Sequence, residues 1–184
     1  MAKNQDNIRI FGDEAGGVWV APRGTTGPTD LSDPPSEFVE LGWLSEDGID
    51  ETLSQNSEVF RAWQGAKVVR RKITQSDQTF RFQCLETNAA TQGLKYRGVE
   101  AEVVGGVAPT LVKDQTRADT RSWVLDMVDG EVTKRYVVPA GDYSRTGTIQ
   151  HRNSGMTIAE YEVTPIGDWF EITDDPAITG ETAD

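Results

Sequence analysis

The chain has 184 residues, of which 36% are hydrophobic, and a formal net charge of −12. This length fits one domain whose core is large enough to be stable without cross-links. The excess of acids argues against a protein that binds nucleic acid tightly, since phosphate binding needs a positive face. The only cysteine, Cys84, excludes an internal disulfide framework and a multi-thiolate metal site. The N-terminus has no apolar signal core and no apolar run reaches the ~18 residues of a membrane span, so we expect a soluble protein made in a reducing cytoplasm.

Strands dominate the predicted elements, because hydrophobic side chains recur with a period of two in FRFQC (80–84), SWVLDMV (122–128) and TIAEYEV (157–163). This alternation is typical of half-buried antiparallel strands, and it places Cys84 in the core with Phe80 and Phe82. In chain order we expect strands near residues 17–21, 38–44, 49–53, 66–74, 78–85, 99–104, 109–113, 121–128, 131–138, 144–150 and 157–165. One short helix is expected within residues 86–96, where Thr87 or Asn88 can cap its start.

Turn residues separate these strands. Asp-Gly pairs at 47–48 and 129–130 favour hairpin turns, and the polar stretches 75–77, 139–142 and 153–155 are expected as further connections. The predicted fold is therefore mainly β, an antiparallel β-sandwich or barrel with one short flanking helix. It forms a single domain over residues 11–173, between a flexible N-terminal arm (1–10) and a flexible acidic C-terminal tail (174–184).

The charges are unevenly placed along the chain. Residues 24–60 contain nine acids and no Lys or Arg, and six acids with no base follow from Gly167 onwards. Between them, residues 61–81 contain six basic residues and one acid: Arg61, Lys67, Arg70, Arg71, Lys72, Arg81 and Asp77. The acidic and basic blocks can neutralise each other within one chain or between copies, and charge alone leaves both arrangements open.

Candidate catalytic and metal sites are weak. SEDGID (45–50) holds three acids but fails the EF-hand pattern, because Gly48 in the sixth position puts Trp43 first and Ser54 last. We interpret SEDGID as a solvated turn. A Cys84–His151 pair is available as a nucleophile and base, but Cys84 is in phase with core residues. Pairs such as Glu160 and Glu162 arise by chance among 30 acids, so we predict no catalytic, metal or cofactor site.

Trp63 is the most informative of the five tryptophans. It is in the connecting stretch VFRAWQG, whereas Trp123 is in phase with a strand and is expected in the core. Exposed tryptophans stack on sugars in carbohydrate-binding sandwiches and are also enriched at protein–protein hot spots. Trp63 therefore leaves two hypotheses open, a carbohydrate-binding module and a protein that assembles through contacts.

Four stretches in order carry a family resemblance: FVELGWLSEDGIDE (38–51), SEVFRAWQGAKVVRR (57–71), TFRFQCLETNAAT (79–91) and MTIAEYEVTPI (156–166). Together they resemble the major tail tube proteins of long-tailed, siphovirus-type bacteriophages, most of all those infecting actinobacteria. The matching stretches run from about Gly16 to Gly167. Their order along the chain is more specific than any single motif.

The resemblance implies a non-enzymatic virion subunit, assembled in the bacterial cytoplasm, whose hexameric rings stack into a tail tube through which DNA passes without sequence-specific binding. Other tail proteins, such as the tape measure, tail tip and tail terminator, are then the expected partners, and no membrane is involved. Residues 52–65 resemble the extended loop that reaches adjacent subunits in that family. We expect interface residues within this loop and the two charged blocks: Phe60, Trp63, Arg61, Arg70, Arg71, Asp47 and Asp50. Lumen-facing candidates are Glu102, Glu160 and Glu162. The alternative function is a non-catalytic carbohydrate-binding β-sandwich.

Overall fold

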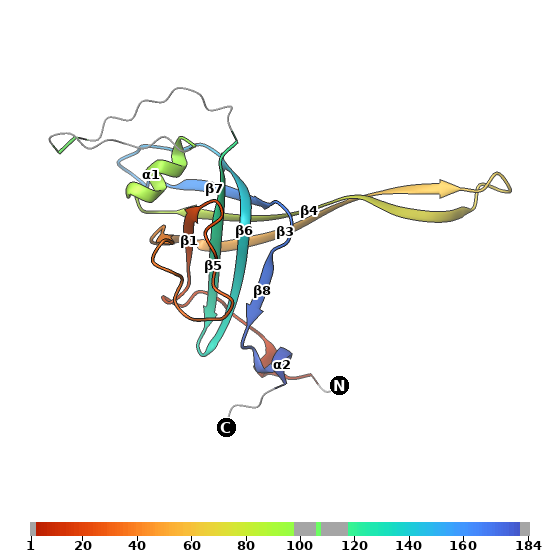
Figure 1. The fold of residues 1–184 in the computed structure, drawn as a ribbon, viewed down its shortest axis with the longest axis horizontal. Helices are drawn as coiled ribbons and strands as arrows, with labels where there is room; N and C mark the ends of the chain where they lie inside the picture. Colours follow the sequence, from red (N-terminus) through yellow and green to blue (C-terminus); the bar gives the residue numbers. More distant parts are fainter. Residues whose placement is uncertain (1–2, 98–105, 108–117, 181–184) are drawn as a thin grey trace.

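The computed structural model describes residues 3–97, 106–107 and 118–180. Its strands form one antiparallel sheet in the order β2-β1-β5-β6-β7-β4-β3, and β8 pairs with β6 off this path (Figure 1). The strand bounds are β1 Gly17–Pro22, β2 Val39–Glu40, β3 Leu44–Arg61, β4 Val68–Cys84, β5 Thr120–Asp129, β6 Val132–Thr146, β7 Ala159–Pro165 and β8 Phe170–Thr173. The expectation of a mainly β, antiparallel fold is confirmed. The expected strands 99–104 and 109–113 lie outside the described residues.

The sheet folds over one aromatic core, so that strands distant in the sheet face each other. In Figure 1, β1, β5 and the first part of β6 run across the direction of β3, β4 and β7. Phe82 on β4 lies 6.1 Å from Trp123 on β5, and Phe80 lies 4.9 Å from Tyr136 on β6, between ring centroids. Buried aromatic surface of this size dominates the stability of a small core. The predicted burial of Phe80, Phe82 and Cys84 is confirmed.

A buried ion pair fixes the long loop before β2 against the sheet. The Arg135 guanidinium donates to both carboxylate oxygens of Asp126, at 2.7 and 2.6 Å, and its remaining Nη1 donates to the carbonyl oxygens of Asp30 and Ser32. Arg135 is only 3% exposed. Because each charge is hydrogen-bonded, the pair is tolerated inside the protein, and it ties the 23–38 segment to β5 and β6.

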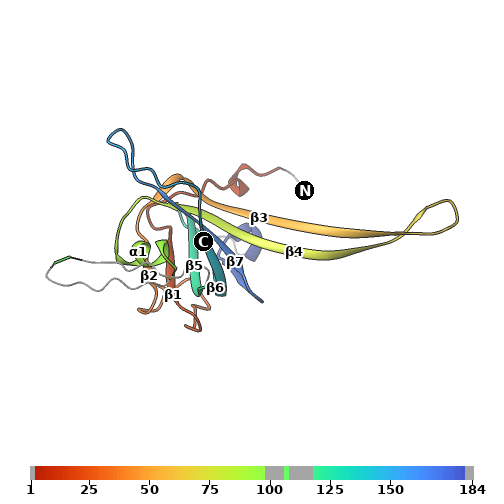
Figure 2. The ribbon, with the colours of Figure 1, turned by 90° about the horizontal axis from the view of Figure 1, so that it is seen from above.

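Strands β3 and β4 form a long hairpin that leaves the body of the protein. Their register runs from Leu44↔Cys84 to Arg61↔Val68, and Figures 1 and 2 show the far half extending well away from the other strands. The strands turn at residues 62–67, where Gly65 and Ala66 have positive φ. We call residues 52–78 the arm. Residues 53–76 are exposed throughout both strands except for Val59, which is partly buried.

Two predicted turns are wrong because they are irregularities inside these strands. The SEDGID stretch belongs to β3, where four residues between Leu44 and Ile49 oppose the single residue Gln83. Gly48, with φ of 69°, supplies the left-handed backbone that this bulge requires. The predicted turn at 75–77 lies within β4, and only a one-residue register shift occurs nearby.

The predicted turn at 139–142 is also wrong, because β6 continues through it as a bulge. Its pairing with β5 shifts by one residue between Arg121 and Trp123. A Cβ on Gly141 would stand 2.9 Å from the Trp123 ring and 2.7 Å from Val163, so the close packing of the indole requires glycine here. The bulge lets β6 pair with β5 and β8 along its first part and with β7 along its second.

The predicted helix is confirmed as α1 (Ala89–Lys95), which flanks the sheet. The Asn88 side chain caps it by accepting from the Thr91 amide, and the Thr91 hydroxyl oxygen accepts in turn from the Asn88 amide. The two ends of the chain also form contacts. The sequence did not predict β8, the short helix α2 (Pro176–Thr179) or the 3₁₀ turn η1 (Gln5–Asn7). Arg9 pairs with Asp175 at 2.6 Å, which joins the N-terminal segment to the start of α2. The flexibility of residues 1–10 and 174–184 stays a prediction.

Candidate assembly surfaces

The arm carries an excess of basic side chains and extends away from the other strands (Figure 1). Its outer part, residues 57–73, carries five basic side chains and one acid, a net charge of +4, which leaves −16 on the rest of the chain. All five are exposed, and none forms an ion pair with the described residues: Arg61, Lys67, Arg70, Arg71 and Lys72. Because Trp63 stands at the turn and is 95% exposed, the arm ends in a large apolar side chain, with Arg61 and Lys67 near it in the sequence.

One face of the arm is partly apolar. Cross-strand partners share a face of a sheet, and the partners Ile49 and Phe82 point into the core. Counting outwards along β3 with period two, the same face carries Leu53, Ser57, Val59 and Arg61. Ile73 is the partner of Ser57, and Val68 is the partner of Arg61. Leu53, Ile73 and Val68 are each more than half exposed. An exposed apolar stripe on a free hairpin is typical of a surface that is covered in an assembly.

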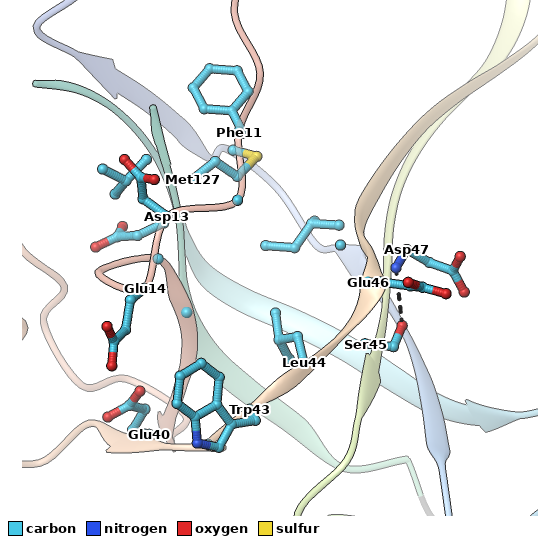
Figure 3. Close-up of a pocket in the computed structure, with 18 of the residues that line it drawn as sticks. Phe11, Asp13, Glu14, Glu40, Trp43, Leu44, Ser45, Glu46, Asp47 and Met127 are labelled. Atoms are coloured by element: carbon cyan, nitrogen blue, oxygen red, sulfur yellow. Dashed lines mark hydrogen bonds between the residues drawn. The ribbon is translucent and has the colours of Figure 1, made fainter. Parts of the chain in front are cut away.

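A groove lies at the other end of β3, beside the N-terminal segment. Its volume is about 920 Å³, and it is lined by residues 9–14 and 16–17, by residues 40 and 42–49, and by residues 126–128 of β5, with Glu86 and Asn88 beyond them. Figure 3 shows Phe11 and Met127 on one side of the hollow and Trp43 and Leu44 on the other. Trp43 is 61% exposed. We call this the acidic groove for the reason given next.

Carboxylates dominate the rim of the acidic groove. Five of them are exposed and form no ion pair with the described part of the chain: Asp13, Glu14, Glu40, Glu46 and Asp47. In Figure 3, Asp13, Glu14 and Glu40 lie on one side of the hollow, and Glu46 and Asp47 project from β3 on the other side, with their carboxylates directed outwards. Among the described residues that line the groove, Arg9 is the only basic one, and it is paired with Asp175. The groove is therefore negative around an apolar floor.

The outer face of the β3-β4-β7-β6 part of the sheet is polar. The register aligns Asp50, Arg81, Glu162 and Ser144 in one row, and Gln83, Glu160 and Thr146 in the next. Arg81 lies 3.6 Å from Glu160 and 3.3 Å from Glu162, and Thr146 donates to Glu160 at 2.6 Å. Partial exposure weakens such pairs energetically, but the network links the polar side chains of the two rows on this face.

The structure offers little for catalysis. Cys84 is 1% exposed, and its burial, reinforced by the nearby Glu86 carboxylate, raises the pKa of the thiol to about 12. His151 is exposed on the connection between β6 and β7. Among the described residues no group of three His, Cys, Asp or Glu side chains is arranged to hold a metal. No helix in the same part of the chain is long and apolar enough to cross a membrane.

The predicted interface residues fall on separate surfaces. Phe60, Arg61, Trp63, Arg70 and Arg71 lie on the arm, and Phe60 is 42% exposed. Of the two predicted acids, Asp47 lies at the groove, whereas Asp50 lies on the polar sheet face opposite Arg81.

Of the predicted lumen residues, Glu160 and Glu162 share one face of β7, and Glu102 lies outside the described residues. The sequence interpretation missed Phe11, Trp43 and the acids at 13–14, because they come together only through the fold.

A family model described as phage tail tube protein matches residues 1–165. No curated protein matches the chain. The match spans most of the sequence, so the chain belongs to the phage tail tube protein family, in agreement with the resemblance of its four motifs.

Proposed function

We propose that this member of the phage tail tube protein family is a non-enzymatic structural subunit whose copies close into hexameric rings, and that these rings stack into the tail tube of a long-tailed phage. The family match supports the tail role. The observation that carries the assembly step is the arm. It continues for ten residues of β3 past Glu51, the partner of the buried Phe80, a span of roughly 33 Å at ~3.3 Å per residue.

The arm needs a partner because a two-stranded hairpin alone is marginally stable in water. Its exposed Leu53, Ile73, Val68 and Trp63 gain stabilisation only when another surface covers them. A contact between the arm of one copy and a different surface of the next is heterologous, and such contacts generate closed rings or open stacks. The arm therefore supports both closure and stacking.

The polar face that carries Glu160 and Glu162 is the proposed lumen surface. DNA must slide through a tube without adhering, and a wall with excess carboxylate repels phosphate. In the two aligned rows described above, three carboxylates (Asp50, Glu160, Glu162) stand against the single cation Arg81. Glu102 stays part of this proposal.

The partners and setting of the subunit follow from the tail role. We propose assembly in the host cytoplasm together with a tape measure, a tail tip complex and a tail terminator. The likeness of the four sequence motifs to subunits from phages of actinobacteria supports a host of that group.

The assembly role is tested by removing the arm. A variant in which Leu53 and Gln78, which face each other in the register, are joined by Asn-Gly keeps every buried core residue. We expect it to retain its β-sheet circular dichroism but to sediment as a monomer at concentrations where the intact chain forms large assemblies. Assemblies of normal size from the shortened chain would refute the role of the arm.

The lumen assignment is tested by the double variant Glu160→Lys with Glu162→Lys. We expect tubes of normal appearance but impaired DNA ejection in phage that carry the variant subunit. A matched control, Asp33→Lys with Glu37→Lys, reverses two exposed acids in the loop before β2. Equal ejection by both variants would show that this face does not line the lumen.

A further inference from the structure

We propose that the acidic groove is the receptor for the tip of the arm of a second copy of this chain. The inference rests on the proposed function, since it requires copies to assemble through the arm. It adds the surface that the arm binds, which is formed by the N-terminal segment, the start of β3 and the end of β5.

The receptor must belong to another molecule. Strand β3 begins at Leu44 on the rim of the groove and runs continuously to Arg61, so the tip lies far from the groove of its own chain. Figures 1 and 2, at right angles to each other, both show the arm directed away from the body. A paired hairpin cannot fold back on itself without breaking its ladder. The contact is thus between copies.

Charge supports this pairing. The outer arm presents five exposed cations that form no ion pair with the described residues. The groove presents five exposed carboxylates that likewise form no ion pair with the described residues. On the polar sheet face, by contrast, Glu160 and Glu162 already share Arg81. Complementary potentials of this kind fix register and orientation and suppress wrong partners.

The apolar parts are complementary as well. Trp63 and Phe60 on the arm are exposed, and the groove presents Phe11, Trp43 and Met127. A hollow of about 920 Å³ is at the upper end of the roughly 300–1,000 Å³ that encloses small ligands, so it has room for an indole and its neighbours. Aromatic anchors that enter a hollow within a charged rim are the usual composition of a binding hot spot.

Cross-linking of the full-length chain tests the contact. One protein carries Gln64→Cys, next to the Trp63 anchor at the tip of the arm, a second carries Glu46→Cys in the groove rim, and a third carries Glu37→Cys as an exposed control outside the groove. The native Cys84 is buried and does not compete. The arm variant is co-assembled with each of the others and oxidised, and disulfide-linked dimers are measured on non-reducing gels.

We expect a dimer band with Glu46→Cys at least ~10-fold stronger than with Glu37→Cys, because a disulfide requires Cα atoms within about 7 Å. Equal or weaker cross-linking at the groove in preparations that contain tubes would overturn the groove as receptor and leave the tail tube role standing. A chain that never self-associates at any concentration would instead contradict the tail tube role and the contact together.

A charge swap gives a second, independent readout. Glu46→Lys with Asp47→Lys and, separately, Arg70→Glu with Arg71→Glu are each expected to raise the concentration for assembly by ~10-fold or more, because they place like charges together. The chain with all four changes should recover most of the loss. The Asp33→Lys, Glu37→Lys control should assemble like the unmodified chain. Absence of recovery in the fourfold variant, with both doubles folded, would count against the pairing.

Discussion

Trp63→Ala is expected to separate assembly from folding more cleanly than any other single change. The side chain is 95% exposed in one subunit, so its removal should change the free energy of unfolding by no more than about 0.5 kcal/mol. A tryptophan that becomes covered buries about 150–250 Å². At ~25 cal/mol per Å² this corresponds to about 4–6 kcal/mol as an upper bound.

The ordering of the side chain costs about 0.5–1.5 kcal/mol of that gain, so each arm contact should weaken by at least ~2 kcal/mol, or ~30-fold in its dissociation constant. Urea unfolding of the dilute chain measures the first quantity, and analytical ultracentrifugation across a concentration series measures the second. Met156→Ala, at a 69% exposed position between β6 and β7, is the matched control. Normal assembly by the Trp63→Ala chain would refute the reasoning, as would a large loss of stability.

Three further predictions concern the body and the charges. Asp126→Asn leaves the buried Arg135 without its anion and should cost about 3–5 kcal/mol in the free energy of unfolding; a loss below ~1 kcal/mol in a urea titration would contradict this. Hydrogen bonds from Arg9 and from the Ala177 amide lower the pKa of Asp175 to about 2. The contribution of this carboxylate to the free energy of unfolding is therefore complete above the unfolded pKa of ~3.9 and is lost as the pH falls towards 2. The stability difference between Asp175→Asn and the unmodified chain should therefore shrink over that range, and a constant difference would show that the pair does not contribute. Raising the salt from ~0.05 to ~0.5 M should weaken self-association, and indifference to salt would point to purely apolar contacts.

The sequence predicted the elements that bury one face. Phe80, Phe82 and Cys84 alternate because one side of β4 packs on the core, and this alternation is visible without a structure. A cap at Thr87 or Asn88 was also predicted, and the structure places it at Asn88, whose side chain acts on the adjacent helical turn. Local chemistry and one-sided burial are the two signals that a single sequence carries directly.

The arm was divided into separate strands and turns for a physical reason. Both of its faces are exposed in one subunit, so no hydrophobic period marks its outer part, and polar stretches such as 75–77 are indistinguishable from turns. Asp47-Gly48 gave a hairpin signal because the four-residue bulge at 45–48 needs a positive φ at Gly48, as a turn does. The continuity of β3 and β4 is set by their pairing with each other, which is a non-local property.

The acidic groove was beyond sequence reasoning because its walls come from three distant segments. Glu14 and Trp43 are 29 positions apart in the chain, yet both line it. The charge blocks led to the prediction that acidic and basic residues pair, but they did not indicate that Asp47 and Asp50 lie on different surfaces of the same strand. Strand register determines that separation.

Negative-stain electron microscopy of the purified, concentrated chain tests the central claim most directly. We predict hollow tubes or stacked rings with six-fold symmetry for the intact chain, and separate particles of subunit size for the arm-shortened chain. A uniform field of monomers from the intact chain, together with saturable binding of a glycan, would contradict the tail tube account and favour a carbohydrate-binding module.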